Sequence, residues 1–355
     1  MGALITDLLL GVGVAAVTSF AACRLLIAAG LWDSPHLARH AHSTPTPTSG
    51  GLGVAAGYAL GVLAIVVLSL LALRDWLAPE DANKLAVATA FSFVFLAIGF
   101  VDDTFPLGPR GKFAAFALAS VSAAWAVGVA RVFPFGTGSV DVGFALGLIG
   151  STLWIFTLVN FVNFMDGANG LAMGSAAIGL AGLALVSLDA HATDAAMMGL
   201  CGAGALIGFL VWNYPGGKLF AGDSGALFVG ALAALASLMA IVQGGISPLI
   251  PPMLFFPMLA DALLTLAWRA YRRRNLLHGH ADHLYQIAIR TKLSHARVSA
   301  ICWLAAAVCA GAAIFSERAG RDWPLIAFVL MAIIGLVIAG GVRRWAVPRG
   351  IAEIE

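Results

Sequence analysis

The chain has 355 residues, of which 61% are hydrophobic and 11% are charged, and its formal net charge is +2. Soluble globular domains carry about 25% charged residues, so this composition excludes a soluble protein and indicates an integral membrane protein. The small net charge gives no support for a nucleic-acid partner. The four cysteines lie in apolar segments without CxxC or metal-ligand spacing, which is typical of small buried side chains.

Apolar segments follow one another along the whole chain. Each has roughly the 20 residues that a transmembrane helix needs, and none shows the alternation of a membrane barrel strand. Because the connections are short, we expect a single membrane domain over residues 1–355. The predicted fold is an all-α polytopic membrane protein with about eleven transmembrane helices, at residues 3–29, 51–73, 85–101, 112–130, 142–161, 171–188, 195–212, 225–242, 248–268, 298–315 and 324–342.

The basic residues predict the orientation of these helices. One set of alternate loops holds 15 of the 20 Lys and Arg residues, and the other set holds 5. The positive-inside rule then places the first set in the cytoplasm, the N-terminus outside and the C-terminus inside. The polar motifs of the chain all fall at the cytoplasmic helix ends in this arrangement, at Asp33, Asp102, Asp103, Asp166, Asp223, His280 and His283.

Asp102 and Asp103 directly follow the apolar run 85–101. A carboxylate at the edge of the hydrocarbon is costly, so such acids are functional candidates by default. Mg²⁺ in proteins prefers a few carboxylates together with substrate phosphates. Lys112 and Arg110 can neutralise phosphate oxygens, and so can the cluster Arg272–Arg274. An equally weighted interpretation makes that cluster a topogenic patch against anionic lipid.

The segment Asn160–Ala172 reads NFVNFMDGANGLA and is the densest polar stretch at a predicted helix end. Asn163 and Asp166 share a helix face if the helix continues that far. A second acid, Asp223, lies in LFAGDSG at the start of an apolar helix. We expect it to cap that helix, where backbone N–H groups also attract anions. Asp223 could cap the helix and bind a metal ion at the same time, so the two roles do not exclude each other.

His280 and His283 lie three residues apart in HADHLYQ. An isolated HxxH pair is a weak zinc signal, and no third ligand follows at metal spacing. Phosphate binding or acid–base chemistry is therefore the preferred interpretation.

Taken in order, these motifs resemble the polyprenyl-phosphate N-acetylhexosamine-1-phosphate transferases, of glycosyltransferase family 4 type, which are related to the phospho-N-acetylmuramoyl-pentapeptide transferases. The resemblance runs from Asp33 to about Arg297, and HADHLYQ is most similar to the O-antigen-initiating branch. Asn169 stands where a second Asp is frequent in the family. The matching pieces are the loop with Asp33, Pro35, His42, Pro45–Pro47, Gly50 and Gly51, the DD pair, NxxNxxDG, the loop with Asn213, Phe220, Gly222, Asp223 and Gly225, and the histidine loop.

The resemblance implies a reaction in which a UDP-amino sugar gives its sugar 1-phosphate to undecaprenyl phosphate and releases UMP. This step would start a lipid-linked cell-envelope polysaccharide, such as the O-antigen of lipopolysaccharide, at the bacterial inner membrane. It implies Mg²⁺, with Mn²⁺ as a substitute, and a homodimer is one expected assembly. The implied roles are metal binding by Asp223 and Asn163, catalysis by Asp102, Asp103 and Asp166, and substrate binding by Lys112, His42, Asn160, Asn213, His280 and His283.

Two alternatives stay open at this point. A secondary transporter also has many helices, intramembrane glycines and buried acids, but it predicts inverted repeats and acids near the midplane. Asp261 alone lies inside a predicted span, and no half of the chain repeats the other. Within the transferase hypothesis, the sequence does not separate direct attack from a covalent aspartyl intermediate.

Overall fold

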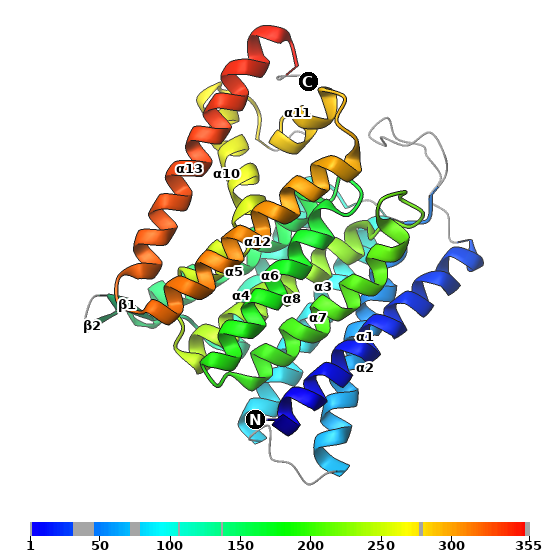
Figure 1. The fold of residues 1–355 in the computed structure, drawn as a ribbon, viewed down its shortest axis with the longest axis vertical. Helices are drawn as coiled ribbons and strands as arrows, with labels where there is room; N and C mark the ends of the chain where they lie inside the picture. Colours follow the sequence, from blue (N-terminus) through cyan, green and yellow to red (C-terminus); the bar gives the residue numbers. More distant parts are fainter. Residues whose placement is uncertain are drawn as a thin grey trace.

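The computed structural model describes residues 2–30, 46–71, 79–105, 107–135, 138–276 and 280–351. Helices dominate this part of the chain, as Figure 1 shows. They are α1 (Gly2–Ala29), α2 (Gly50–Leu71), α3 (Pro79–Thr104), α4 (Pro109–Val127), α5 (Gly143–Met165), α6 (Leu171–Asp189), α7 (Thr193–Asn213), α8 (Gly222–Gly244), α9 (Ile250–Leu254), α10 (Phe256–Tyr271), α11 (Leu284–Arg290), α12 (His295–Ala319), α13 (Trp323–Ala346) and the 3₁₀ turn η1 (Val347–Arg349).

The prediction of an all-α polytopic membrane protein is confirmed. Each predicted span overlaps helix, and among the described residues nine helices are long and apolar enough to cross a membrane. The predicted span 248–268 is not one helix, because the chain breaks between α9 and α10 at Phe255. Pro257 lies in the first turn of α10, where its missing N–H and fixed φ are tolerated but cannot continue a preceding helix.

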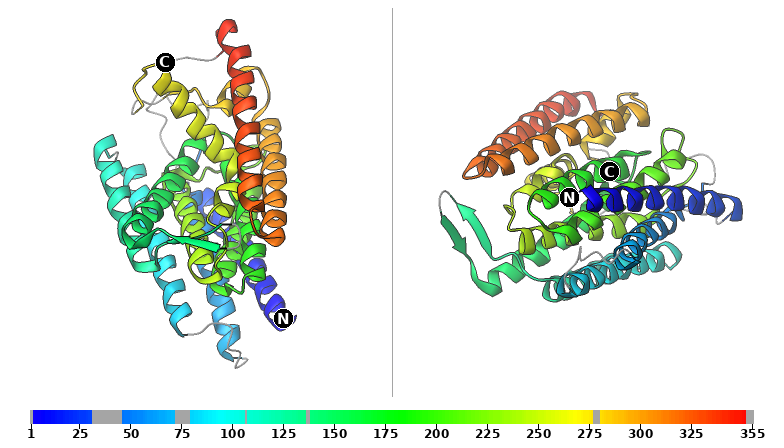
Figure 2. Two further views of the ribbon diagram at one scale, coloured as in Figure 1. Left: turned by 90° about the vertical axis from the view of Figure 1, so that its left-hand side faces the viewer. Right: turned by 60° about the horizontal axis from the view of Figure 1, so that its bottom comes forward.

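A short antiparallel hairpin joins α4 to α5 and was not predicted. Strands β1 (Val132–Phe135) and β2 (Gly138–Asp141) pair with Val132 opposite Asp141. The hairpin projects from the side of the bundle in Figure 2. It belongs to a loop, so it leaves the helical fold class unchanged.

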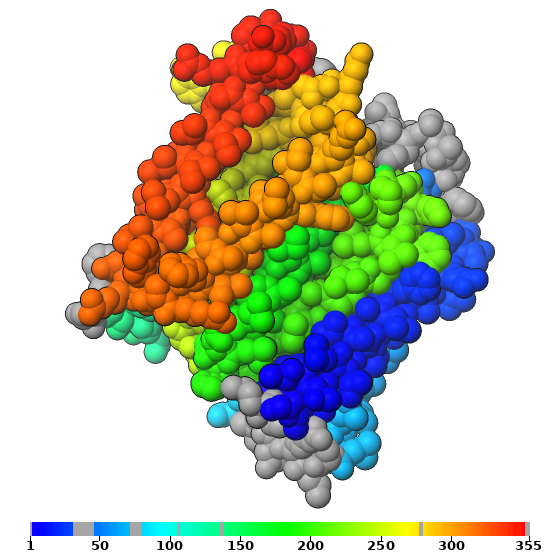
Figure 3. Space-filling view, viewed as in Figure 1, coloured from blue at the N-terminus to red at the C-terminus, as the bar shows by residue number. Residues whose placement is uncertain are grey.

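Helix α8 forms the centre of the bundle. Of the most apolar 18-residue stretch in each helix, 89% is buried in α8 and 11% in α13. Helices α3, α5 and α7 pack against α8, whereas α1 and α13 lie on opposite sides of the molecule (Figures 1 and 3). Large exposed apolar side chains cover the outer helices, for example Leu25 at 70% and Val337 at 68% exposure. These surfaces suit contact with lipid, because exposing so many apolar side chains to water would be unfavourable.

Small residues bring the helices close enough to build the polar end of the bundle. A Cβ added to Gly99 of α3 would lie 2.5 Å from the backbone of Ser224, and one added to Gly230 would lie 2.7 Å from that of Val159. Glycine and alanine allow this approach of helix backbones in membrane proteins. The contact at Gly99 places the last turn of α3, with Asp102 and Asp103, beside the first turn of α8.

Candidate active site

Three predicted residues meet at the ends of α3, α4 and α8. The ammonium group of Lys112 lies 2.5 Å from Asp102 Oδ2 and also pairs with Asp223 Oδ2. Asp102 Oδ1 accepts a hydrogen bond of 2.8 Å from the backbone N–H of Leu107, which fixes the carboxylate. Asp223 is the more exposed of the two acids, with 30% of its side chain accessible against 9% for Asp102. One cation therefore joins two carboxylates from distant parts of the chain.

Asp103 points in another direction, because neighbouring residues on a helix diverge by about 100°. Its two oxygens accept hydrogen bonds from the backbone N–H groups of Asp223, at 2.9 Å, and Ser224, at 3.0 Å. The prediction that Asp223 caps its own helix is thus wrong. Helix α8 begins at Gly222, so Asp223 lies within the first turn, and Asp103 supplies the cap from α3.

Gly222 makes this junction possible. It has a φ of +71°, and an added Cβ would lie 2.9 Å from Asp103 Oδ2. A side chain there would combine left-handed backbone strain with a clash against the cap. The described end of the first loop packs at the same place, because Phe220 N donates to Pro47 O at 2.8 Å and Gly51 N donates to Ala221 O at 2.9 Å. The predicted substrate residue His42 lies outside the described residues.

Asn163 lies in the last turn of α5, and Asp166 begins the loop that follows it. Asp166 follows the last residue of α5, and its backbone N–H donates to Asn163 O at 3.2 Å. Desolvation raises the pKa of Asp166 well above its ordinary value, and the negative charges of Asp223 and Asp103 raise it further. Asp166 is therefore within electrostatic reach of the carboxylate cluster. A bound cation would favour its ionised form.

His280 and His283 lie on the segment before α11, with ring centroids 5.0 Å apart. His283 is buried, and its Nδ1 lies 3.4 Å from Asp261 Oδ1. Burial lowers the pKa of His280 to about 4, and the charges of His283 and Arg269 act in the same direction. At neutral pH, His280 is therefore a neutral hydrogen-bonding group and not a cation.

Asp261 of α10 holds this segment in place, and sequence reasoning missed its role. Its carboxylate accepts hydrogen bonds from the backbone N–H groups of Leu284, at 2.8 Å, and Tyr285, at 3.1 Å, and from Thr265 Oγ1, at 3.2 Å. These contacts satisfy the first N–H groups of α11 from another helix. A buried acid inside an apolar span needs hydrogen-bond donors nearby. The position of Asp261 in such a span was therefore the sequence feature that could have revealed its role.

The histidine segment and the loop after α5 touch each other. Tyr285 Oη donates to Phe164 O at 3.3 Å, and the rings of Phe164 and His283 have centroids 6.4 Å apart. A Cβ on Gly167 would collide with the Tyr285 hydroxyl, so only glycine permits this packing. The loop around Asp166 thereby lies next to the histidines and within electrostatic reach of the carboxylates on α3 and α8.

Two predicted substrate-binding residues have other partners in the structure. Asn213 is buried, its Oδ1 accepts from Gly170 N at 2.6 Å, and its Nδ2 donates to Leu219 O at 2.8 Å. It therefore ties the loop after α5 to the loop before α8. Asn160 is buried in α5 and donates to Phe156 O of its own helix at 2.7 Å. Substrate contact by either residue stays a prediction.

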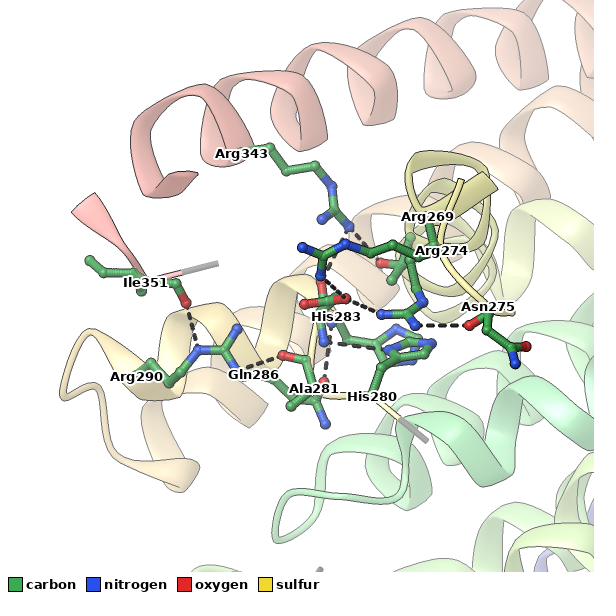
Figure 4. Close-up of polar contacts among 12 residues, drawn as sticks. Arg269, Arg274, Asn275, His280, Ala281, His283, Gln286, Arg290, Arg343 and Ile351 are labelled. Atoms are coloured by element: carbon green, nitrogen blue, oxygen red, sulfur yellow. Dashed lines mark hydrogen bonds and ion pairs between the residues drawn. The ribbon is translucent and has the colours of Figure 1, made fainter. Parts of the chain in front are cut away.

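Arginines surround the histidine segment, as Figure 4 shows, and two of them, Arg269 and Arg343, are buried. Arg269 of α10 pairs with Asp282, and Arg274 Nη1 lies 3.9 Å from the same carboxylate. Arg343 of α13 donates to Asp282 O at 3.3 Å and to Thr265 Oγ1 at 2.7 Å. The cluster Arg272–Arg274 is thus divided, because Arg274 serves the histidine segment while Arg272 stacks on Trp268 with its guanidinium carbon 5.6 Å from the ring centroid.

The carboxylates fit a Mg²⁺ ion that is held partly by a substrate. Among the described residues, no three His, Cys, Asp or Glu side chains are arranged to enclose a metal. Mg²⁺ usually takes one or two carboxylates and completes its shell with water and phosphate oxygens. Asp223 is partly exposed and within electrostatic reach of Asp166, so its carboxylate offers a ligand of that kind. The donor set suits a hard cation and lacks the nitrogen and sulfur ligands of a zinc site.

Comparisons with known proteins identify the family of the chain. Residues 85–241 match the model of glycosyl transferase family 4, a range that contains the carboxylates, Lys112 and the loop after α5. The decaprenyl-phosphate N-acetylglucosaminephosphotransferase of Mycobacterium tuberculosis is 30% identical over 86% of this chain and 79% of its own. A probable undecaprenyl-phosphate N-acetylglucosaminyl 1-phosphate transferase of Bacillus subtilis is 25% identical over 89% of this chain and 86% of its own.

The similarity extends to a second group of enzymes. The phospho-N-acetylmuramoyl-pentapeptide-transferase of a Synechococcus species is 34% identical over 58% of this chain and 62% of its own. These relatives are transferases, and they give the transporter alternative no support. A multi-pass membrane phosphoglycosyltransferase accounts for the helices and for the similarities together. The chain belongs to the polyprenyl-phosphate N-acetylhexosamine-1-phosphate transferase family.

Proposed function

We propose that the protein transfers an N-acetylhexosamine 1-phosphate from a UDP-amino sugar to undecaprenyl phosphate, with release of UMP. The observation that carries this proposal is the bridge of Lys112 between Asp102 and Asp223, with Asp103 fixing the start of α8 beside it. A fixed cation among carboxylates at helix ends suits a reaction in which two phosphorylated substrates meet. The relatives are named as transferases that act on a polyprenyl phosphate and an N-acetylglucosamine phosphate, which supports this acceptor and this transferred group.

The transfer needs positioning and charge neutralisation more than covalent chemistry. An oxygen of the acceptor phosphate attacks the phosphorus that carries the sugar, the bond to the UMP oxygen breaks, and UMP leaves with that electron pair. The acceptor phosphate has a second pKa near 6, so it is mostly ionised at neutral pH without a base. Asp102 would orient Lys112 toward the acceptor phosphate, and Asp103 would hold the first turn of α8 in place.

Asp223, with Asn163 or Asp166, would hold Mg²⁺, which Mn²⁺ is expected to replace. The bound ion would neutralise the donor diphosphate and stabilise UMP as the leaving group. His280, neutral because of its lowered pKa, would donate a hydrogen bond to the donor phosphates, and His283 would face the same group. Arg110, exposed at the start of α4, would attract the nucleotide sugar.

We further propose that this end of the bundle faces the cytoplasm, where UDP-sugars are made. The 15-to-5 distribution of basic residues supports it. Cysteine probes in a Cys-free background at exposed Glu80, in the first turn of α3, and at exposed Ser294, before α12, should label oppositely in intact cells. An impermeant reagent should reach Glu80→Cys but not Ser294→Cys, and labelling of the latter alone would reverse the orientation.

The sugar and the final polymer are narrower proposals. The similarity of HADHLYQ to the O-antigen-initiating branch supports an O-antigen product and an N-acetylhexosamine donor. The direct experiment incubates purified protein with undecaprenyl phosphate, Mg²⁺ and a panel of UDP-sugars, followed by mass spectrometry of the lipid phase. Formation of an undecaprenyl-diphospho-sugar with one member of the panel is expected. UMP or UDP release that does not require the lipid would contradict the proposal. The homodimer stays a prediction.

A further inference from the structure

A pocket opens between α10 and α13, on different helices from the carboxylates. Its volume is about 650 Å³, and one wall is apolar while its rim carries arginines. A site of this kind fits a ligand with an apolar tail and an anionic head. The residues that line it include Leu264, Trp268, Arg272, Gly340, Arg343 and Arg344.

The rim of the pocket has the composition of a membrane–water interface. Tyr271, the last residue of α10, is 80% exposed, and Trp268 lies one turn before it. The guanidinium carbons of Arg272 and Arg343 lie 5.6 Å and 5.4 Å from the Trp268 ring centroid. Trp and Tyr are enriched at the level of lipid headgroups, and arginines near helix ends reach the same level. The rim is therefore placed to meet a lipid phosphate.

The wall of the pocket is hollowed at Gly340 of α13. A Cβ added to this glycine would have no heavy atom within 4 Å, so the space in front of it is open. Leu264 from α10 and Leu336 from α13 continue the apolar surface. An acyl chain can lie along such a surface without meeting a polar group, because the charged groups are confined to the rim.

We propose that this pocket binds an anionic phospholipid of the surrounding leaflet, with its phosphate at Arg272 and Arg344 and an acyl chain along Gly340. Arg343 has a double role, because it lines the pocket and also donates to Asp282 O and Thr265 Oγ1. The bound lipid would therefore stabilise the position of Arg343, which contacts the histidine segment. The proposal does not depend on the reaction that the protein performs.

A resident phospholipid fits better than the reacting acceptor lipid. The acceptor phosphate has to reach the carboxylates and Lys112, which lie on α3, α4 and α8. Helices α10 and α13 pack instead against each other, against α11 and α12, and, for α10, against α5. Figure 1 shows α13 along one side of the molecule and α3 and α8 in its middle. A phosphate at Arg272 and Arg344 would be held on different helices from the reacting groups.

The test measures lipid binding to the full-length protein by native mass spectrometry in a mild detergent, with no sugar donor present. Phosphatidylglycerol and phosphatidylcholine with identical acyl chains serve as probes. The wild-type protein should bind phosphatidylglycerol more tightly. The double variant Arg272→Gln/Arg344→Gln should weaken phosphatidylglycerol binding by about thirtyfold, as expected for two interfacial arginines, and weaken phosphatidylcholine binding less, because the choline group already offsets the charge of its phosphate.

Two further variants sharpen the result. Arg24→Gln/Arg297→Gln removes the same charge from exposed arginines of α1 and α12 and should leave the lipid affinity unchanged. Gly340→Leu keeps every charge but fills the hollow, so it should weaken both lipids while the thermal unfolding midpoint stays close to that of the wild type.

Equal affinity of the wild-type protein for the two lipids would overturn the proposal, as would equal effects of the two double arginine variants. Undecaprenyl phosphate provides the competing outcome. If it displaces phosphatidylglycerol one for one, and Arg272→Gln/Arg344→Gln raises the KM for undecaprenyl phosphate, the pocket belongs to the acceptor and the phospholipid assignment is wrong. Because binding is measured without a donor, failure of the proposed transfer reaction would leave this result interpretable.

Discussion

The two halves of the candidate site are built in different ways. The carboxylate half rests on α3 and on α8, whose most apolar stretch is 89% buried, and a single cation joins its acids. The histidine half consists of the segment with His280 and His283 and the seven-residue helix α11, which residues of α10 and α13 hold in place. The most apolar stretch of α13 is only 11% buried. The central helix α8 anchors the first half, whereas a polar network at the edge of the bundle fixes the second.

This difference predicts how each half responds to mutation. A change at a carboxylate should remove chemistry and leave the fold, because α8 is held by packing along its whole length. A change in the histidine half should loosen a locally stable unit and weaken donor binding more than turnover, because few apolar contacts support it. The four experiments that follow are ordered by expected effect.

Asp223→Asn should lower kcat by about a thousandfold, because an amide is a poorer Mg²⁺ ligand and no longer pairs with Lys112 as an anion. Asp189→Asn is a matched control, since that exposed acid pairs with Arg318 at the end of α6 away from the site. Thermal unfolding of both variants should resemble that of the wild type. Near-normal, Mg²⁺-dependent UMP release by Asp223→Asn would remove this residue from the metal site.

Asp102→Ala and Asp103→Ala should separate two neighbouring acids. Each should lower kcat by about a hundredfold, with less change in the KM for the UDP-sugar. Asp103→Ala should also lower stability, by about 1 kcal/mol, because it removes the cap from the N–H groups of Asp223 and Ser224. The measurement is kinetics together with thermal unfolding. A wild-type stability of Asp103→Ala would show that the cap is unimportant, and a loss of donor binding with normal kcat would move both acids to the nucleotide pocket.

Asp261→Asn should raise the KM for the UDP-sugar by about tenfold and change kcat less. The amide keeps one acceptor oxygen, so α11 loses one of the two backbone hydrogen bonds that Asp261 accepts. Glu317→Gln is the control, because that carboxylate also accepts a backbone N–H, from Ser247 at 3.1 Å, but outside the site. A selective loss of kcat would instead place Asp261 among the reacting groups.

The pH dependence of stability should reveal His280. Its pKa is about 4 in the folded protein and near 6.5 in the unfolded chain. Between these values only the unfolded chain binds the proton, so stability falls as the pH drops from 6.5 to 4. His280→Gln should remove part of that fall, on the order of 1 kcal/mol after allowing for partial exposure. Identical pH profiles of the unfolding midpoint for both proteins would contradict the lowered pKa.

The sequence predicted the helices well, because long apolar runs determine them directly. It also identified Asp102, Asp103, Asp166 and Asp223 as acids at helix ends, since charge is rare beside hydrocarbon. It did not predict the break at Phe255, where local proline chemistry divides one apolar run. Periodicity and composition describe a segment by itself, and they do not show which partner it finds.

Tertiary contact partners explain where the structure differs from the predictions made from the sequence. Asp223 appeared to be a helix cap from its position, but the cap comes from Asp103, which is 120 residues away. The cluster Arg272–Arg274 could be read as a topogenic patch, yet Arg274 lies near Asp282 of the histidine segment while Arg272 stacks on Trp268. Asp261 appeared to be an isolated intramembrane acid until the N–H groups of α11 were seen beside it. Each assignment depends on tertiary contacts between distant residues.

The most direct test of the proposed reaction follows the sugar-bearing phosphate of the donor. The protein is incubated with undecaprenyl phosphate, Mg²⁺ and UDP-N-acetylglucosamine carrying ³²P in that phosphate, and the lipid and aqueous phases are separated. Transfer of sugar 1-phosphate predicts that the label moves into the lipid phase and that the released UMP is unlabelled, with both signals lost in Asp223→Asn. Label that stays in the aqueous phase as UDP, while sugar reaches the lipid, would show simple glycosyl transfer and contradict the proposed function.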